Sequence, residues 1–226
     1  MIPAYNEEKA IRSVIVDALE LKNKINNYQT EIIVIDDGSS DNTVKIAKEF
    51  PIKIVQMGKN KGKGAALRSV IEDLPDEIIV GTIDADGTYP MEDFPNLLEL
   101  MDKQNLDLVI GSRFLGMIEG GMPFLNLVGN IIFSKLISLL TGRNITDASS
   151  GMRIFKTKMF KDLGINANGL EFEVELTTAS LSRGYRVKEY PIIYRERIGR
   201  SKLKPFKDGF TFFTTIISTI RRLRKK

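Results

Sequence analysis

Apolar positions in the first half of the chain follow two spacings, one typical of helices and one typical of buried strands. Between Ile11 and Leu19 they recur on one face of a helix, which Asn6 is placed to cap. Asp41 is placed to cap a second helix. The elements predicted beyond the first helix are helices at 42–50 and 63–73 and strands at 31–37, 52–56 and 78–83.

Short, almost continuous apolar strands that alternate with amphipathic helices predict βαβ units and a parallel sheet covered on both faces. In sheets of this class the ligand lies beyond the carboxyl ends of the strands. Two acidic clusters follow predicted strands, Asp36-Asp37-Gly38-Ser39 and Asp84-Ala85-Asp86-Gly87. We therefore expect both clusters to face one crevice.

The second half of the chain is less regular. An apolar segment at 124–140 is interrupted by Asn126, Asn130 and Lys135, which favours a helix at the core or at a membrane interface over a membrane-spanning one. Neither a repeat nor a linker divides the chain, and 226 residues suit one domain. The other elements predicted in this half are strands at 106–111 and 185–193 and a helix at 170–183.

The chain contains no cysteine, histidine or tryptophan. Without cysteine there is no disulfide framework and no thiolate metal site. Without histidine the usual general base and the commonest zinc ligand are missing, so composition argues against Ser-His-Asp hydrolases and zinc enzymes. No signal peptide is expected, because Pro3 and the acidic pair Glu7-Glu8 interrupt the start of the sequence. We therefore expect a protein that faces the cytoplasm.

The formal net charge of +4 is unevenly divided along the chain. From Arg195 onward there are 11 Lys and Arg against 2 Asp and Glu, a local charge of +9, whereas the rest carries −5. Within this part, an apolar stretch at 210–220 lies between basic clusters, which is typical of an interfacial helix on anionic lipid. A nucleic-acid surface would need aromatic residues among the basic ones. Lipid is therefore favoured, with a helix packed on the core as the alternative.

Asp84 and Asp86 are spaced to hold a hard divalent cation together with substrate phosphates, an arrangement that Mg²⁺ or Mn²⁺ favours. An EF-hand is not indicated, because Gly87 comes too early and Pro95 stands where that loop needs glutamate. The alternative is a solvated acidic turn.

A glycine-rich segment at 58–64 has neither the Walker nor the Rossmann spacing. The amides at the start of the following helix, with Lys63, are nevertheless placed to attract a diphosphate. The alternative is a flexible turn that opens the helix.

Seven segments in order resemble one enzyme family. They are similar to family 2 glycosyltransferases with the GT-A fold, in particular the polyprenyl-phosphate group that includes the dolichol-phosphate mannose synthases. The segments are IPAYNEE at 2–8, IDDGSSDNT at 35–43, NKGKGAA at 60–66, DAD at 84–86, GSR at 111–113, DASSGMRIF at 147–155 and RSK at 200–202.

This resemblance implies an α/β protein with a Rossmann-like, mostly parallel central sheet, helices on both faces and a carboxyl-terminal amphipathic helix. We expect a single GT-A domain over 1–208, with a nucleotide-sugar half at about 1–112 and an acceptor half at 113–208. Residues 209–226 are expected to form a basic amphipathic tail that contacts the membrane from the cytoplasmic side. No nucleic-acid partner is expected, and the oligomeric state is not predicted.

The resemblance also implies roles for individual residues. Asp84 and Asp86 match the metal motif, and Asp86, Arg113, Glu171 and Glu173 are expected near the reacting atoms. The residues expected to bind the nucleotide sugar are Pro3, Ala4, Tyr5, Glu7, Asp36, Asp37, Lys63, Asp84, Ala85 and Asp86. Those expected to bind the acceptor phosphate are Arg113, Arg197, Arg200, Ser201 and Lys202.

Three features depart from that family. We expect the strand that normally precedes Pro3 to be almost absent, and we expect none of the membrane-spanning helices that some relatives append. Thr88 stands where many mannose synthases have glutamine, which leaves the metal geometry and the donor open.

The expected reaction is a metal-dependent, inverting transfer of a hexose, with mannose from GDP-mannose as the first candidate, to a polyprenyl or dolichyl phosphate. A phosphate acceptor is already largely a dianion at neutral pH, so a chain without histidine can carry out this step. The alternatives are a UDP-glucose donor, a glycan or soluble alcohol as acceptor, and a non-catalytic nucleotide-binding membrane module.

Overall fold

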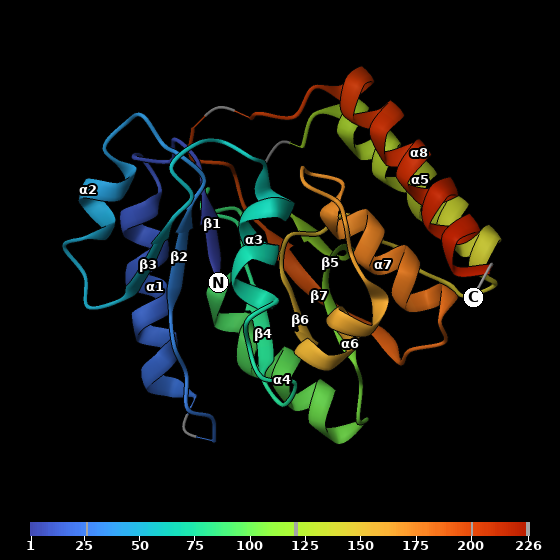
Figure 1. Cartoon of the computed structure of the whole chain (residues 1–226), viewed down its shortest axis with the longest axis horizontal. Helices are drawn as coiled ribbons and strands as arrows, with labels where there is room; N and C mark the ends of the chain where they lie inside the picture. The colour runs from blue at the N-terminus through green and yellow to red at the C-terminus, as the bar shows by residue number, and fades with distance from the viewer. Residues whose placement is uncertain (26, 120–121, 200, 225–226) are drawn as a thin grey trace.

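The first third of the chain folds as the alternation of strands and helices that its sequence predicts, preceded by a short strand, β1, that was not predicted (Figure 1). The computed structural model describes residues 1–25, 27–119, 122–199 and 201–224. Asn6 does not cap the first helix, because Ala10 precedes it and the Asn6 carboxamide oxygen accepts a bond from the Ser40 amide instead. The elements are β1 (Ile2–Ala4), α1 (Ile11–Lys24), β2 (Ile33–Asp36), α2 (Thr43–Ala47), β3 (Lys53–Gln56) and α3 (Lys63–Ile71).

The rest of the described chain contains every element predicted there and several that were not. The unpredicted elements are a 3₁₀ turn η1 (Met91–Asp93), helix α4 (Phe94–Lys103), strand β6 (Arg153–Lys156) and helix α6 (Thr157–Leu163). The predicted elements are β4 (Ile79–Thr82), β5 (Leu108–Ile118), α5 (Phe124–Thr141), α7 (Phe172–Ser182), β7 (Val187–Tyr194) and the carboxyl-terminal helix α8 (Pro205–Arg224).

The strands form two sheets that lie edge to edge. The first has the order β1-β2-β3 and is entirely parallel; the second has the order β4-β6-β5-β7. In the second sheet β5 and β7 are parallel, whereas β6 is antiparallel to both of its neighbours. The Met1 nitrogen donates to the Gly81 carbonyl at 2.7 Å and the Ile83 amide donates to the Met1 carbonyl at 3.2 Å. These bonds place β1 beside β4, so the expected α/β class with its helix-covered sheet is confirmed, with β6 as its antiparallel strand.

Both faces of this layer are buried, as the apolar strands predict. Along β2, Ile33 and Ile35 belong to one core cluster while Val34 belongs to the other. The cluster around Val34 includes apolar residues of α1 and α4, and the cluster around Ile35 includes those of α3, α6, α7 and α8. The polar residues at the strand ends therefore project from an ordered, two-sided core.

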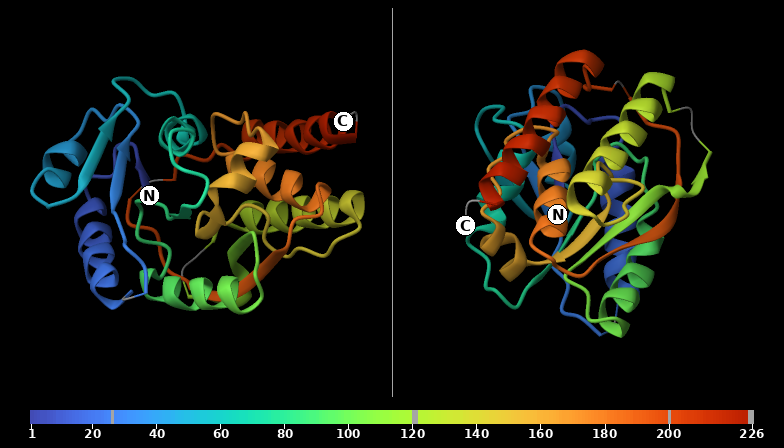
Figure 2. Two further views of the ribbon diagram at one scale, coloured as in Figure 1. Left: turned by 60° about the horizontal axis from the view of Figure 1, so that its bottom comes forward. Right: turned by 90° about the vertical axis from the view of Figure 1, so that its right-hand side faces the viewer.

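Helices α5 and α8 lie next to each other over α7, at the edge of the molecule farthest from β3 (Figures 1 and 2). The inner face of α8 belongs to the core, because Phe212, Ile216 and Ile220 are buried there. The predicted boundary after residue 208 falls inside this helix, which begins at Pro205. The division of the chain into donor and acceptor halves stays a prediction.

Helix α5 is the one helix in the described ranges that is long and apolar enough to cross a membrane. Its 18 residues have a mean hydropathy of 1.6, and 11% of them are buried. The core helix of a soluble protein meets the same length and composition test, so α5 alone is weak evidence for a membrane span.

Candidate active site

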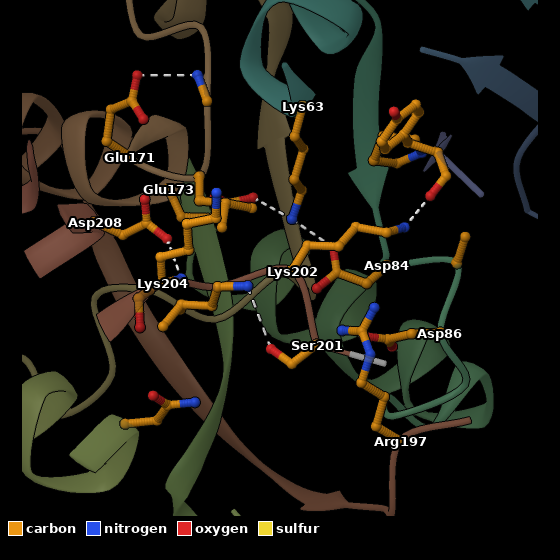
Figure 3. Close-up of a pocket in the computed structure, with 18 of the residues that line it drawn as sticks. Lys63, Asp84, Asp86, Glu171, Glu173, Arg197, Ser201, Lys202, Lys204 and Asp208 are labelled. Carbon is orange, nitrogen blue, oxygen red and sulfur yellow. Dashed lines mark hydrogen bonds and ion pairs between the residues drawn. The ribbon is translucent and has the colours of Figure 1, made fainter. Parts of the chain in front are cut away.

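A cavity of about 870 Å³ opens at the carboxyl ends of β1 and β4. Its wall is completed by the start of α3, the start of α7 and the segment between β7 and α8 (Figure 3). It extends to the beginnings of α5 and α8, where Asn126 and Thr211 line it. The predicted site residues that line it are Pro3, Ala4, Tyr5, Glu7, Asp37, Lys63, Asp84, Ala85, Asp86, Arg113, Glu171, Glu173, Arg197, Ser201 and Lys202. Of the remaining two, Asp36 is not in this wall, and Arg200 lies outside the described residues.

Asp36 ends β2 and Asp37 follows it, and both accept bonds from backbone amides. Asp36 accepts from Gly38 and Ser39 at 3.2 Å, which shapes the turn locally. Asp37 accepts from Lys61 and Gly62, each at 2.8 Å, and so ties this turn to the glycine-rich segment. Asp36 is therefore a turn residue, and Asp37 alone of the pair faces the cavity.

The glycine-rich segment opens α3 and is held by close backbone packing. The amides of Gly64 and Ala65 donate to the carbonyls of Gly169 and Asn168, at 3.3 and 3.0 Å. A Cβ on Gly64 would collide with the Ala167 carbonyl. The amides of Gly64 and Ala65 are therefore already bonded and are not open to an anion. The segment instead packs against residues 167–169 and holds Lys63 in place.

Lys63 lies between two carboxylates, with its ammonium bonded to Asp84 and 2.6 Å from an oxygen of Glu173 (Figure 3). Burial alone would lower the pKa of Lys63, but the two carboxylates raise it well above its ordinary value. Lys63 is therefore a permanent cation beneath the metal motif.

Asp84 and Asp86 lie in different electrostatic surroundings. Burial would raise the pKa of Asp84, but contact with Lys63 outweighs it and holds the pKa below the ordinary range. Burial and the charge of Asp84 together raise the pKa of Asp86, although Arg197 donates to it at 2.5 Å and the Thr88 hydroxyl at 2.7 Å. A further cation would therefore stabilise the ionised form of Asp86 more than that of Asp84.

The two carboxylates fit a divalent cation whose coordination shell is completed by the substrate. Within the described ranges no group of three or more acidic, histidine or cysteine side chains could hold a metal alone. Asp84 and Asp86 supply two carboxylates, and Mg²⁺ and Mn²⁺ commonly take their other ligands from water and phosphate oxygens.

Arg113, at the end of the core part of β5, is held by Asp147. Its Nε and Nη2 atoms each donate to one Asp147 oxygen at 2.7 Å, and Nη2 also donates to the Ser149 hydroxyl at 3.0 Å. Burial would lower the pKa of Arg113, but Asp147 raises it. In the described part of the chain Nη1 has no such bond, so it is the nitrogen available to a ligand in the cavity.

Glu171 and Glu173 have different surroundings although the sequence grouped them. Glu171 accepts from the amides of Asn168 and Gly169, at 3.1 and 2.9 Å, and so holds the loop that packs on α3. Glu173 is 2% exposed and faces Asp84 across Lys63. Only Glu173 is placed beside the metal motif.

The segment between β7 and α8 crosses the cavity and joins two strand ends. Arg197 donates to Asp86 and, at 2.9 Å, to Glu7, and Lys202 donates to Glu7 at 2.6 Å. Burial raises the pKa of Glu7 despite these two cations. Ser201 also lines the cavity. The expected basic loop is therefore part of the site.

Several lining residues were not predicted. Asn126 and Asn130 had a signal, because they interrupt an apolar helix four residues apart and so share one face. Ser149 also lines the cavity, and it lies with Asp147, which is behind the wall, in a motif to which no role was given. The other unpredicted lining residues include Tyr89, Tyr194, Lys204, Lys207 and Asp208.

Residues 1–164 match the family model described as glycosyl transferase family 2. The chain belongs to glycosyltransferase family 2. It is 37% identical over 214 residues to a dolichyl-phosphate hexose transferase of Haloferax volcanii, covering 94% of this chain and 89% of the relative. It is 31% identical to a UDP-N-acetylglucosamine–dolichyl-phosphate N-acetylglucosaminyltransferase of Methanococcus voltae, covering 87% and 85%. It is 29% identical to a dolichol-phosphate mannosyltransferase of Pyrococcus furiosus, covering 90% and 58%.

Solved structures confirm the fold of this glycosyltransferase. Glucosyl-3-phosphoglycerate synthase of Mycobacterium tuberculosis in complex with Mg²⁺ and UDP matches 97% of this chain and 77% of its own, with a TM-score of 0.73 at 22% identity. Its complex with Mn²⁺, UDP and phosphoglyceric acid matches with a TM-score of 0.71. The GT-A fold is confirmed; the roles of individual site residues stay predictions.

Proposed function

We propose that this glycosyltransferase moves a hexose from a nucleotide sugar to a polyprenyl phosphate such as dolichyl phosphate, with inversion. The observation that carries the proposal is one cavity that runs from Asp84 and Asp86 to the beginnings of α5 and α8. The relatives of Haloferax, Methanococcus and Pyrococcus named above are transferases with dolichyl or dolichol phosphate in their names, which supports the acceptor class.

The donor diphosphate fits the acidic end of the cavity. A divalent cation on Asp84 and Asp86 would neutralise charge that develops on the departing nucleoside diphosphate. Lys63 holds the ionised Asp84 in place, and residues 3–5 and Asp37 line the space beside it. GDP-mannose is the first donor to test; UDP-glucose and UDP-N-acetylglucosamine follow.

The acceptor phosphate fits the cationic end. Arg113 presents its Nη1 atom, and Ser201, Lys202, Lys204 and Lys207 line the same cavity. The arginine and the three lysines offset the repulsion between the donor diphosphate and the acceptor phosphate and so bring them together. The second pKa of a phosphate monoester is about 6, so the acceptor attacks as a dianion without a protein base.

The polyprenyl chain fits the exposed apolar faces of α5 and α8, and we place that face on the cytoplasmic surface of the membrane. Phe206 and Phe210 are 88% and 72% exposed, and Phe124 and Leu139 are 74% and 80% exposed. Arg221 and Arg224 at the end of α8 add charge that anionic lipid attracts.

The membrane contact is tested with Phe206→Ser/Phe210→Ser. Because these side chains contact little of the core, the variant should keep its melting temperature and lose most of its binding to anionic vesicles, since each phenylalanine contributes about 1.5–3 kcal/mol when buried. Flotation measures this. Phe212→Ser is the matched control and should instead unfold the protein, and unchanged flotation of the double variant would contradict the membrane contact.

The reaction is tested by incubation with Mg²⁺ or Mn²⁺, each nucleotide sugar and a polyprenyl phosphate, followed by detection of a lipid-linked sugar. Asp86→Ala should lower transfer by about 10³-fold, because several kcal/mol of charge stabilisation is lost. The fold should persist, because burial and the charge of Asp84 raise the pKa of Asp86 and so make its ionised form unfavourable in the folded protein. Near-full activity of this variant would refute the metal role.

The alternatives give different products in the same assay. If sugar is found only on a soluble glycan or alcohol, that compound is the acceptor in place of the lipid. Its hydroxyl group would then require a carboxylate base such as Glu173. If the protein neither transfers the sugar nor hydrolyses the donor with any nucleotide sugar, the result indicates a non-catalytic module.

A further inference from the structure

Arg153 is a fully buried cation at the start of β6 with no role in the site as described so far. It is 0% exposed and belongs to the DASSGMRIF motif. Its Nε and Nη2 donate to the Ser150 carbonyl, and Nη2 also donates to the Ala148 carbonyl at 3.5 Å. Its Nη1 donates to the Glu173 carbonyl at 3.2 Å and to the Thr177 hydroxyl at 3.3 Å.

No carboxylate accepts a bond from this guanidinium in the part of the chain that the structure describes. A buried charge without a paired counter-charge is rare and costly, and burial lowers the pKa of Arg153 although the carboxylates of Glu173, Asp147 and Asp84 act against it. An apolar side chain would fill this volume at lower cost, so core packing alone does not account for an arginine here.

The bonds of Arg153 join two pieces of the site that are far apart in sequence. One piece is the segment 148–151, whose Gly151 packs so tightly on Asp84 that an added Cβ would lie 2.5 Å from a carboxylate oxygen. The other is the first turn of α7, which carries Glu173. The Thr177 hydroxyl makes a second tie between them, because it donates to the Ala148 carbonyl at 3.0 Å.

We propose that Arg153 is a positioning residue that sets the separation of Asp84 and Glu173, the two carboxylates that share Lys63, and thereby the geometry in which Asp84 meets metal and diphosphate. The inference rests on the proposed function for the nature of that ligand. The guanidinium is suited to the task because its planar fork holds several acceptors at fixed angles, which a lysine ammonium does not do.

The decisive variant is Arg153→Lys, which keeps the charge and loses the fork. The probe is Mn²⁺ with GDP or with UDP, and its dissociation constant is measured by electron paramagnetic resonance beside kcat, the donor KM and the melting temperature. Residues that orient metal ligands typically affect metal affinity or activity by about 10–100-fold. We expect a loss of that size in Mn²⁺ affinity and in kcat, with the protein still folded.

Arg12→Met is the matched control, because Arg12 is an exposed arginine paired with Glu49 outside the cavity. Its Mn²⁺ affinity and kcat should stay within about twofold of the parent. A folded Arg153→Lys protein with Mn²⁺ affinity and kcat as close to the parent as this control would overturn the proposal.

Thr177→Val provides the test if Arg153→Lys does not fold. It removes one acceptor of the guanidinium and the second tie to Ala148 while keeping the side-chain shape. We expect a loss of about 10-fold in Mn²⁺ affinity, the lower end of the range for residues that support metal ligands; a folded variant with parental affinity would reject the positioning role. If the parent itself binds no Mn²⁺ with either nucleotide, the proposed function fails instead, and the two failures are thereby distinguished.

Discussion

The two sides of the cavity stabilise their carboxylates in different ways. At the end of β2, Asp36 and the cavity-lining Asp37 accept bonds from backbone amides of turns. On the side of β5 and α7, Asp147 and Glu173 are held by the side-chain cations Arg113 and Lys63. The carboxylates at the end of β2 are therefore held by turns, and those beside β5 and α7 by buried ion pairs between distant segments.

This difference predicts how each side fails. A carboxylate held by two amides loses one of its two acceptor atoms when it becomes a carboxamide, because the amide oxygen still accepts a hydrogen bond and the NH2 group does not. A carboxylate paired with a buried cation loses more, because its removal leaves the cation unpaired in a low-dielectric interior.

The largest effect is expected for Asp147→Asn, which breaks the bidentate pair with Arg113. Both side chains are buried, at 0% and 8% exposure, so the free energy of unfolding should fall by about 3–5 kcal/mol. Urea denaturation measures it. Asp37→Asn is the comparison on the other side and should cost about 1–3 kcal/mol, because one partly buried amide loses its acceptor. Equal losses would break the distinction between the two sides.

A smaller effect is expected for Gly64→Ala, which tests the close packing of the α3 backbone on residues 167–169. The new Cβ would meet the Ala167 carbonyl, and forced overpacking costs about 1–3 kcal/mol. Gly129→Ala on α5 is the matched control, because its Cβ would lie 3.9 Å from the nearest atom, on Phe133. That control should be neutral or stabilising by up to about 1 kcal/mol. Thermal unfolding of both variants shows whether packing or helix propensity decides.

The smallest effect is expected at Asp107, which cations hold at the surface. Burial would raise its pKa, but the Arg186 amide and the cations of Lys156 and Arg186 lower it. Asp107→Asn should therefore cost about 1 kcal/mol at pH 7. Because the folded pKa is depressed, this stabilisation is fully present above the ordinary aspartate pKa of about 3.9 and is lost as the pH falls through the folded value. Denaturation at pH 7 and pH 2.5 should show that the difference in free energy of unfolding between the parent and Asp107→Asn becomes smaller in acid. A difference that grows in acid would contradict a depressed pKa of Asp107.

The fold was predictable wherever a segment carried its own signal. Strands β2 and β4 are short apolar runs flanked by polar turns, and their neighbours α1 and α3 have helical periodicity. Strand β6 has four residues and passes directly into α6, so its place between β4 and β5 depends on pairing with residues about 45 and 75 positions away. Local sequence does not contain that information.

The site shows the same limit. The acidic clusters were expected in one crevice because strands of one direction end at one edge, and Asp37, Asp84 and Asp86 do line one cavity. The partners of these carboxylates were not predictable, since Lys63 meets Glu173 across 110 positions. The packing of the glycine-rich segment was not predictable for a related reason, because the amides of Gly64 and Ala65 bond to residues 169 and 168 of a distant loop.

The outward phenylalanines of α8 have a kinetic consequence. An enzyme that sits on a bilayer and draws its acceptor from it encounters that acceptor in two dimensions. With α8 docked as proposed, the rate follows the mole fraction of polyprenyl phosphate in the vesicle, and diluting the acceptor with inert lipid slows transfer even when the total amounts of enzyme and acceptor are unchanged. The Phe206→Ser/Phe210→Ser variant removes this surface-dilution behaviour together with the anchor.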